Sequence, residues 1–200
     1  MTTETHPLEP FLPPSTQLLI LGSFPPARKR WCMDFFYPNF TNDMWRIFGL
    51  CFHGNKLHFV DELRKTFKQN EIEQLLIQKS IGIFDTARKV IRSKNTASDK
   101  DLEVVEATNI SLLLDSVPQC KALVTTGQKA TDIVCNLFGI RQPEVGKFAS
   151  FEFQTRKLML FRMPSSSRAY PLKVEKKAEV YLPMFQQLGI ISSESSSIIK

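Results

Sequence analysis

The chain has 200 residues, of which 42% are hydrophobic and 23% are charged, and its net charge is +6 at pH 7. This composition predicts one globular domain with a sizeable core, and it excludes collagen, coiled coils, secreted disulfide scaffolds and acidic disordered proteins. The apolar runs are far shorter than the about 20 residues of a membrane span, and the N-terminus lacks the basic and apolar regions of a signal peptide.

The basic residues fall into two clusters. Arg28, Lys29 and Arg30 are consecutive, and residues 156–177 contain seven Lys and Arg against a single acid, Glu175. This excess favours a polyanionic partner such as nucleic acid, although it can equally serve solubility. If the two segments lie together in the fold, they form one basic patch.

Four prolines among the first sixteen residues predict an extended lead-in over residues 1–16 that wraps the domain. A single domain is expected over residues 17–191, and a polar, flexible tail over 192–200.

Four short apolar runs alternate with helical patterns. Their residues are apolar throughout rather than alternating, which predicts parallel strands covered on both faces. The predicted strands are Gln17–Ser23, Ser80–Asp85, Ala122–Thr126 and Lys157–Met163. The predicted helices are Asn42–Phe52, Asp61–Gln78, Leu102–Val117, Gly127–Phe138 and Lys173–Leu188. The alternation predicts an α/β fold, a three-layer α/β/α sandwich with a central four-stranded parallel sheet.

In such a sheet, ligands bind beyond the carboxyl ends of the strands, so the loops after the four strands should hold the site. The first loop combines two prolines, several aromatic side chains including Tyr37, and the amides of Asn39 and Asn42. A stiff backbone, flat rings and neutral amides suit a planar heterocycle that is stacked on a ring and hydrogen-bonded at its edge. The aromatic residues equally fit a core, and Asn42 equally fits the N-cap of the helix that follows.

The other loops differ in how informative they are. Asp85 ends the second strand, where a buried carboxylate needs a partner; it could cap a helix or accept a hydrogen bond from a base N–H. The third loop lacks the spacing of a phosphate-binding P-loop and fits a simple strand-to-helix turn. The fourth loop is Pro164-Ser165-Ser166-Ser167-Arg168. Its hydroxyls and amides can hold phosphates, and Arg168 adds a charge or a plane that can enter a gap in a base stack.

The four cysteines, Cys32, Cys51, Cys120 and Cys135, form no CxxC pair and have no histidine at zinc-finger spacing. Free thiols are the preferred interpretation, with an iron–sulfur or zinc site as the alternative.

Taken in order, these motifs resemble the uracil-DNA glycosylase superfamily, and in particular its mismatch-specific uracil/thymine-DNA glycosylase and hypoxanthine-DNA glycosylase branches. Gly22-Ser23-Phe24-Pro25-Pro26 is similar to the first motif of the family, and Tyr37–Trp45 to its aromatic-Pro…Asn-x-Phe-Trp stretch. Gly82–Asp85 resembles the base-recognition strand, and Met163–Ser167 the Met-Pro-Ser-Ser-Ser segment that inserts into DNA. The resemblance spans about residues 18–188 and implies the strand order 2-1-3-4.

The sequence departs from the mismatch branch at Phe24, which aligns with a catalytic Asn there and cannot position water. The hypoxanthine branch is similar to this chain in having an apolar residue at that place, and it depends on the Asn that aligns with Asn42. The catalytic candidates are therefore the polar groups expected at the carboxyl ends of the strands, Asn42, Asp85 and Asn39, of which Asn42 fits the alignment with the hypoxanthine branch. The base-binding candidates are Ser23, Phe24 and Tyr37. The DNA-binding candidates are Ser165, Ser166, Ser167, Arg168 and Lys173.

The resemblance implies a monofunctional DNA N-glycosylase that hydrolyses the base–sugar bond of a flipped uracil or hypoxanthine, with mismatched thymine as a further candidate. The expected partner is double-stranded DNA with a damaged or mismatched base, bound by a monomer without metal, cofactor or membrane. Such a protein would be cytoplasmic at the nucleoid in a bacterium and nuclear in a eukaryote. Two alternatives stay open: a weak or inactive glycosylase-fold protein that binds nucleic acid or damaged bases, and an unrelated nucleotide-handling α/β enzyme.

Overall fold

The computed structural model describes residues 2–93 and 101–192. Its central sheet has the strand order β5-β2-β8-β10-β9. Neighbouring strands are parallel from β5 to β10, so the parallel strands follow the order 2-1-3-4 along the chain, and β9 is antiparallel to β10. The strands are β2 (Leu18–Gly22), β5 (Ile81–Asp85), β8 (Ala122–Thr126), β9 (Lys147–Phe153) and β10 (Arg156–Met163).

The four parallel strands are those whose apolar runs are continuous. All residues of β2, β5 and β8 are buried, because helices cover both faces of the sheet. The prediction of a four-stranded sheet was wrong in the number of strands, because β9 adds a fifth, antiparallel strand at the edge. Only Phe151 and Phe153 of β9 are buried, so this strand lacks the continuous apolar run that identified the others.

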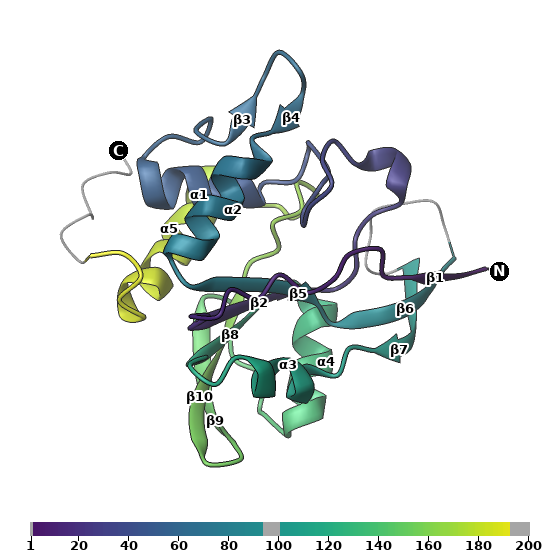
Figure 1. The fold of residues 1–200 in the computed structure, drawn as a ribbon, viewed down its shortest axis with the longest axis vertical. Helices are drawn as coiled ribbons and strands as arrows, with labels where there is room; N and C mark the ends of the chain where they lie inside the picture. Colours follow the sequence, from purple (N-terminus) through teal and green to yellow (C-terminus); the bar gives the residue numbers. More distant parts are fainter. Residues whose placement is uncertain (1, 94–100, 193–200) are drawn as a thin grey trace.

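The helices are α1 (Met44–His53), α2 (Gln69–Gln78), α3 (Ile110–Ser116), α4 (Gln128–Phe138), α5 (Val174–Gln187) and the short 3₁₀ helix η1 (Arg28–Arg30). Figure 1 shows α1, α2 and α5 on one side of β2 and β5, and α3 and α4 on the other. This arrangement is the one that right-handed crossovers between parallel strands produce for this strand order. None of the described helices is both long and apolar enough to cross a bilayer.

Two predicted helices were wrong over their first halves. The segment predicted as Asp61–Gln78 begins with a short hairpin of β3 (Val60–Asp61) and β4 (Thr66–Phe67), and only its second half forms α2. Leu63 in the hairpin is 98% exposed, whereas α2 buries Ile72, Leu75 and Leu76. The apolar residues of the first half therefore do not continue the helical stripe.

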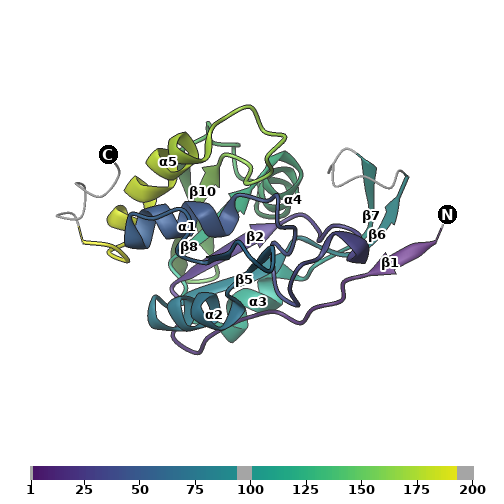
Figure 2. The same cartoon turned by 90° about the horizontal axis from the view of Figure 1, so that it is seen from above.

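The segment predicted as Leu102–Val117 likewise divides into the strand β7 (Leu102–Ala107) and the helix α3. The side chain of Asn109 caps α3 by accepting a hydrogen bond from the Leu112 amide at 3.0 Å, so the helix begins there. β7 pairs with β6 (Ala87–Arg92), which pairs with β1 (Thr3–Thr5) in a small antiparallel sheet. Figure 2 shows this sheet at one end of the molecule, away from α1 and α5.

The described part of the lead-in, residues 2–16, runs from β1 along the edge strand β5. Phe11 and Ile83 exchange two backbone hydrogen bonds of 3.0 and 2.9 Å. The lead-in therefore closes the edge of the central sheet beside β5. Of the predicted tail, only Ser192 belongs to the described residues, and the remainder lies outside them.

Candidate active site

A cleft of about 710 Å³ lies at the carboxyl ends of the four parallel strands. It is lined by residues from all four loops that follow these strands, including Gly22–Pro26, Tyr37–Asn39, Asp85, Thr126 and Met163–Pro171. Strand register explains the convergence, because Gly22 is paired with Asp85 and Met163 with Thr126. The ends of neighbouring parallel strands thus lie at one level, and the loops leave the sheet together.

Asp85 is a buried carboxylate with a buried histidine beside it. His6 Nε2 lies 2.9 Å from Asp85 Oδ2, and both residues are less than 10% exposed. The backbone of Asp85 is also fixed, because its carbonyl accepts a hydrogen bond of 2.7 Å from the Thr108 hydroxyl. Asp85 therefore does not cap the next element, which is a strand, and its partner comes from the far end of the chain.

Gly22 is what allows Asp85 and Tyr37 to approach each other. A Cβ atom at this position would overlap Asp85 Oδ1 and would lie 3.2 Å from the Tyr37 hydroxyl. Two polar groups from different loops thus lie over one glycine in the wall of the cleft. Any side chain at position 22 would occupy the space between them.

Tyr37 has a backbone φ of 50°, in the left-handed region that side chains other than glycine rarely adopt. The conformation is held on both sides, since Trp45 Nε1 donates to the Phe36 carbonyl at 3.1 Å and the Cys32 amide donates to the Pro38 carbonyl at 2.9 Å. The Tyr37 hydroxyl lies 2.8 Å from Thr126 Oγ1. Backbone strain fixed in this way is typical of residues placed for a ligand.

Asn39 and Asn42 both line the cleft, and both use their side-chain oxygen locally. Asn39 Oδ1 accepts from the amide and hydroxyl of Thr41 at 3.1 and 3.0 Å, and Asn42 Oδ1 accepts from the Met44 amide at 2.9 Å. The Asn42 side chain thus satisfies a backbone amide in the first turn of α1. Asn42 is not the N-cap itself, because α1 begins at Met44 and its N-cap is Asp43. The Nδ2 groups are the parts of these side chains available to a ligand.

Ser23 and Phe24 form the side of the cleft next to the small sheet. Phe24 is 9% exposed and packs against Ala87, Val90 and Leu102, with its ring edge-on to His6 at 5.3 Å between centroids. An apolar ring in an apolar cluster can shape the cleft wall but brings no polar group to it.

The fourth loop is tied to the helices by its carbonyl groups. The Pro164 carbonyl accepts from the Tyr181 hydroxyl at 2.9 Å, the Ser166 carbonyl from the Asp43 amide at 2.9 Å, and the Ser167 carbonyl from Lys177 Nζ at 2.8 Å. Burial raises the pKa of Tyr181 well above its usual value, so this hydroxyl keeps the proton that it donates. The loop is therefore a rigid edge of the cleft.

A buried ion pair lies beneath this loop. Lys177 Nζ donates to Asp43 Oδ2 at 2.9 Å, and the lysine is fully buried. Arg168 Nη2 lies 3.5 Å from Asp43 Oδ1, with 58% of its side chain exposed. Asp43, at the N-cap of α1, thus connects α1, α5 and the fourth loop.

The charges that line the cleft are Asp85 and three arginines, Arg92, Arg162 and Arg168. Arg92 is bound to Glu4 and to the Pro25 carbonyl, and Arg162 to the Pro143 carbonyl and Gln128. Arg168, at the rim, is the most exposed of these four charged residues. The cleft is therefore net positive, which suits an anionic ligand.

Two of the predicted DNA-binding features lie outside the cleft lining. Lys173 lines a neighbouring depression of about 600 Å³ that shares Arg168, Tyr170 and Pro171 with the cleft. The consecutive basic residues 28–30 form the exposed helix η1, which follows the cleft-lining residue Pro26. Lys173 lies outside the cleft lining because it is the N-cap of α5 and belongs to the start of that helix. The buried Lys177 follows it by four residues in the same helix.

The cysteines lie apart from the cleft, and all four are free thiols. Burial raises the pKa of Cys51 to about 12 and that of Cys120 to about 11. Among the residues that the structure describes, no three His, Cys, Asp or Glu side chains come together as metal ligands would.

Sequence reasoning missed the cleft-lining residues Thr126, Arg92 and Arg162, and it missed His6, which is buried behind Asp85. Thr126 could have been found, because it ends a predicted strand at the level of the other loops. His6 gave no signal, because it lies in a proline-rich segment 79 residues before its partner.

Comparison with known proteins shows a likeness of fold. No family model matches the chain, and no curated protein sequence matches it. The fold is similar to the solution NMR structure of a protein from Methanosarcina acetivorans described as a putative uracil DNA glycosylase, with a TM-score of 0.58. The match covers 90% of this chain and 96% of the other at 22% sequence identity. The chain therefore has a mixed α/β fold of the kind found in that protein.

Proposed function

We propose that this protein is a DNA N-glycosylase that removes a deaminated base from double-stranded DNA. The observation that carries the proposal is the convergence of Tyr37, Asn42 and Asp85 in one cleft with the Ser165–Arg168 loop at its edge. The similarity of the fold to a protein described as a putative uracil DNA glycosylase supports it. A flipped base needs a stacking ring, edge-reading polar groups and a nearby contact with the DNA backbone, and these are the groups available here.

Each residue has a distinct role in the proposed site. Tyr37 stacks on the flipped base, and Asp85 accepts a hydrogen bond from a base N–H. Asn42 and Asn39, whose side-chain oxygens are engaged, donate from Nδ2 to a base oxygen or to the attacking water. Ser23 and Phe24 close the pocket behind the base.

In the reaction, water adds to the sugar C1′ as the bond from C1′ to the base nitrogen breaks. The base leaves as an anion with the bonding electron pair, and the proton lost by the water passes to that anion or to solvent. The positive cleft stabilises the departing base anion. No lysine lines the cleft among the described residues, so we propose hydrolysis without a covalent lysine intermediate.

Ser165, Ser166, Ser167 and Arg168 would hold the backbone around the flipped nucleotide, with Lys173 on the flanking phosphates. Arg168 would fill the gap that the base leaves. We propose that a monomer acts on uracil or hypoxanthine, with mismatched thymine as a third substrate. Its place in the cell would be where the DNA is, at the nucleoid or in the nucleus.

A second candidate is a protein of this fold that binds damaged DNA without cutting it. Phe24 favours this alternative, because it is packed in an apolar cluster at a position where a water-positioning group would be useful. The proposed activity then depends entirely on Asn42, Asn39 and Asp85.

The test is a strand-cleavage assay after alkali treatment on duplexes that contain uracil, hypoxanthine, xanthine or thymine opposite each normal base. The proposal predicts alkali-dependent cleavage at uracil or hypoxanthine. Binding of these duplexes without cleavage of any would favour the second candidate.

A further inference from the structure

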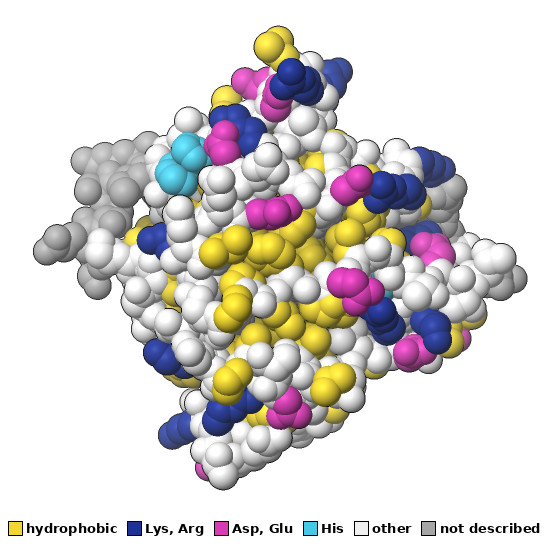
Figure 3. Space-filling model, viewed as in Figure 1, with side chains coloured by type: hydrophobic (Ala, Val, Ile, Leu, Met, Phe, Trp, Pro, Cys, Tyr) yellow, Lys and Arg dark blue, Asp and Glu magenta, His cyan; other side chains and the backbone are white. Residues whose placement is uncertain are grey.

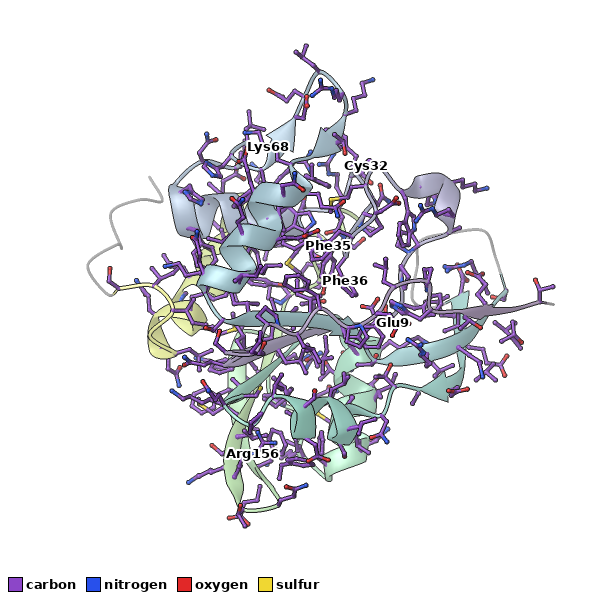
Figure 4. The ribbon with its side chains drawn as sticks, viewed as in Figure 1. Glu9, Cys32, Phe35, Phe36, Lys68 and Arg156 are labelled. Atoms are coloured by element: carbon purple, nitrogen blue, oxygen red, sulfur yellow. The ribbon has the colours of Figure 1, made fainter. Side chains whose placement is uncertain are left out.

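His6 lies in a setting that only the folded N-terminal segment creates. Its side chain is completely buried and is surrounded by the rings of Phe24, Phe36 and Phe84, whose centroids lie 5.3, 6.2 and 4.6 Å from its own. Figure 4 shows Phe36 just above β5, with Glu9 of the N-terminal segment nearby. The imidazole therefore has two polar neighbours in an apolar surrounding, namely the backbone of Leu8 and the carboxylate of Asp85.

The segment that carries His6 is firmly attached to the domain. β1 pairs with β6, the His6 amide donates to the Arg88 carbonyl at 2.9 Å, and Phe11 bridges to Ile83. Figure 3 shows hydrophobic side chains gathered in the middle of the face where the segment crosses β5 in Figure 1. The position of the imidazole is thus set by backbone pairing on both sides of it.

The contacts of His6 Nδ1 determine what Nε2 offers to Asp85. Nδ1 lies 2.9 Å from the Leu8 carbonyl oxygen and 3.2 Å from the Leu8 amide nitrogen. A neutral ring can accept from the amide at Nδ1, and a charged ring can donate to the carbonyl. Both forms place an N–H on Nε2, facing Asp85 Oδ2. The remaining form, a neutral ring with its N–H on Nδ1, would turn the Nε2 lone pair toward the carboxylate oxygen and is disfavoured there, so the carboxylate is held as a hydrogen-bond acceptor.

The other oxygen, Oδ1, is then left for the cleft. It lies over Gly22 on the side of the Tyr37 hydroxyl, and Asp85 and Gly22 both line the cleft. An oxygen that can only accept hydrogen bonds recognises one chemical feature of a base edge, namely an N–H group. The ring nitrogen on the pairing edge of cytosine and adenine carries a lone pair and accepts a hydrogen bond. In their deamination products, uracil and hypoxanthine, the same nitrogen carries a hydrogen and donates.

On the basis of the function proposed above, we propose that His6 is a positioning and specificity-determining residue. By donating from Nε2 to Asp85 Oδ2, it fixes Asp85 as an acceptor, and the site thereby favours bases with an N–H at that ring nitrogen. Cytosine or adenine would bring a ring-nitrogen lone pair against the carboxylate oxygen, and a site built to pair with an N–H discriminates strongly against an analogue that lacks it. His6 acts through Asp85 and need not touch the base.

The test measures binding of duplexes that cannot be cut, in which a 2′-fluoro sugar carries either hypoxanthine or adenine opposite the same base. His6→Phe keeps a ring of similar shape but removes the donor. His6→Gln restores an N–H at the same number of bonds from Cα as Nε2. Glu9→Gln on the same segment is the control, because it neutralises one partner of an exposed ion pair with Arg88 and does not touch Asp85.

We expect the wild-type protein and Glu9→Gln to bind the hypoxanthine duplex about tenfold or more tightly than the adenine duplex. This ratio corresponds to the contribution of one hydrogen bond to a charged group. The preference should fall toward unity in His6→Phe and recover in His6→Gln. In an Asp85→Asn background, His6→Phe should have no further effect on the ratio. Thermal unfolding checks that each variant is folded, and His6→Asn, whose amide is one bond too short, replaces His6→Phe if that variant does not fold.

An unchanged preference in His6→Phe, or an equal further change in the Asp85→Asn background, would overturn the role of His6. Because this readout needs no cleavage, a protein that cuts no duplex would overturn the proposed function alone.

Discussion

Gly22→Ala is the substitution that tests the geometry of the cleft most locally. The added Cβ would overlap Asp85 Oδ1 and would lie 3.2 Å from the Tyr37 hydroxyl. Reaching ordinary contact at 3.4 Å requires Asp85 Oδ1 to move by about 1 Å. The carboxylate cannot move freely, because His6 holds its other oxygen at 2.9 Å. A misplacement of this size lowers catalysis by about 10²-fold in well-ordered sites, and we expect a loss of that order in single-turnover base release.

Gly82→Ala is the matched control. It makes the same change in the neighbouring parallel strand β5, where the Cβ would lie 3.0 Å from Leu12 and Thr16 side-chain carbons, away from the cleft. Both substitutions crowd the core and should cost about 1–3 kcal/mol of unfolding free energy, measured by urea denaturation. Only Gly22→Ala should lose the cleavage activity. Equal activity in the two folded variants would refute the placement of Asp85 and Tyr37 in the reacting site.

The remaining predictions concern single groups of the cleft and of its support. Tyr37→Ala should weaken the complex with a flipped base by about 1–3 kcal/mol in a binding titration, whereas Tyr37→Phe keeps the stack; a folded, fully active Tyr37→Ala protein would end the stacking role. Asn42→Ala should lower single-turnover cleavage by about 10²-fold with little change in DNA affinity, and loss of folding instead would assign Asn42 to the helix cap. Arg168→Ala should impair cleavage of paired substrates more than of unpaired ones, and equal losses would remove Arg168 from the gap-filling role. Lys177→Met should cost about 3–5 kcal/mol of unfolding free energy, because it leaves Asp43 without its buried partner. The exposed Lys176→Met on the same helix should cost about 0–1 kcal/mol, and similar losses in the two variants would contradict the buried pair.

The parallel strands and the loops after them could be predicted from the sequence because their signal is local. A strand covered on both faces is apolar at every position, as in Leu18–Gly22, and its carboxyl end then indicates where a ligand can bind. Asp85, Tyr37 and the serine loop were found in this way. They line one cleft because the strands that carry them are neighbours in register.

The antiparallel parts could not be predicted, because their strands are short or only partly buried and so lack the continuous apolar run of a strand covered on both faces. Only Leu102 of β7 is buried, and its strand conformation is stabilised by pairing with β6. The same holds for the N-terminal segment, whose short strand β1 pairs with residues 89–91. Long-range pairing leaves little trace in local periodicity.

His6 illustrates the same limit at the site. A lone histidine among prolines carries no catalytic pattern, and its importance arises only when β1 brings it within 2.9 Å of Asp85. Phe24 shows the converse, since its place in the first motif identified it as a cleft residue, while its packing against Val90 and Leu102 depends on the small sheet.

The central claim is that this cleft hydrolyses a base–sugar bond. The most direct measurement quantifies, from one single-turnover reaction, the free base released and the strand breaks before and after alkali, on duplexes with uracil or hypoxanthine. We expect free base in equal amount to alkali-labile sites, no strand break before alkali, and a loss of both products in Asp85→Ala. Stable binding of the duplexes without release of any base, or strand breaks that appear without alkali, would contradict it.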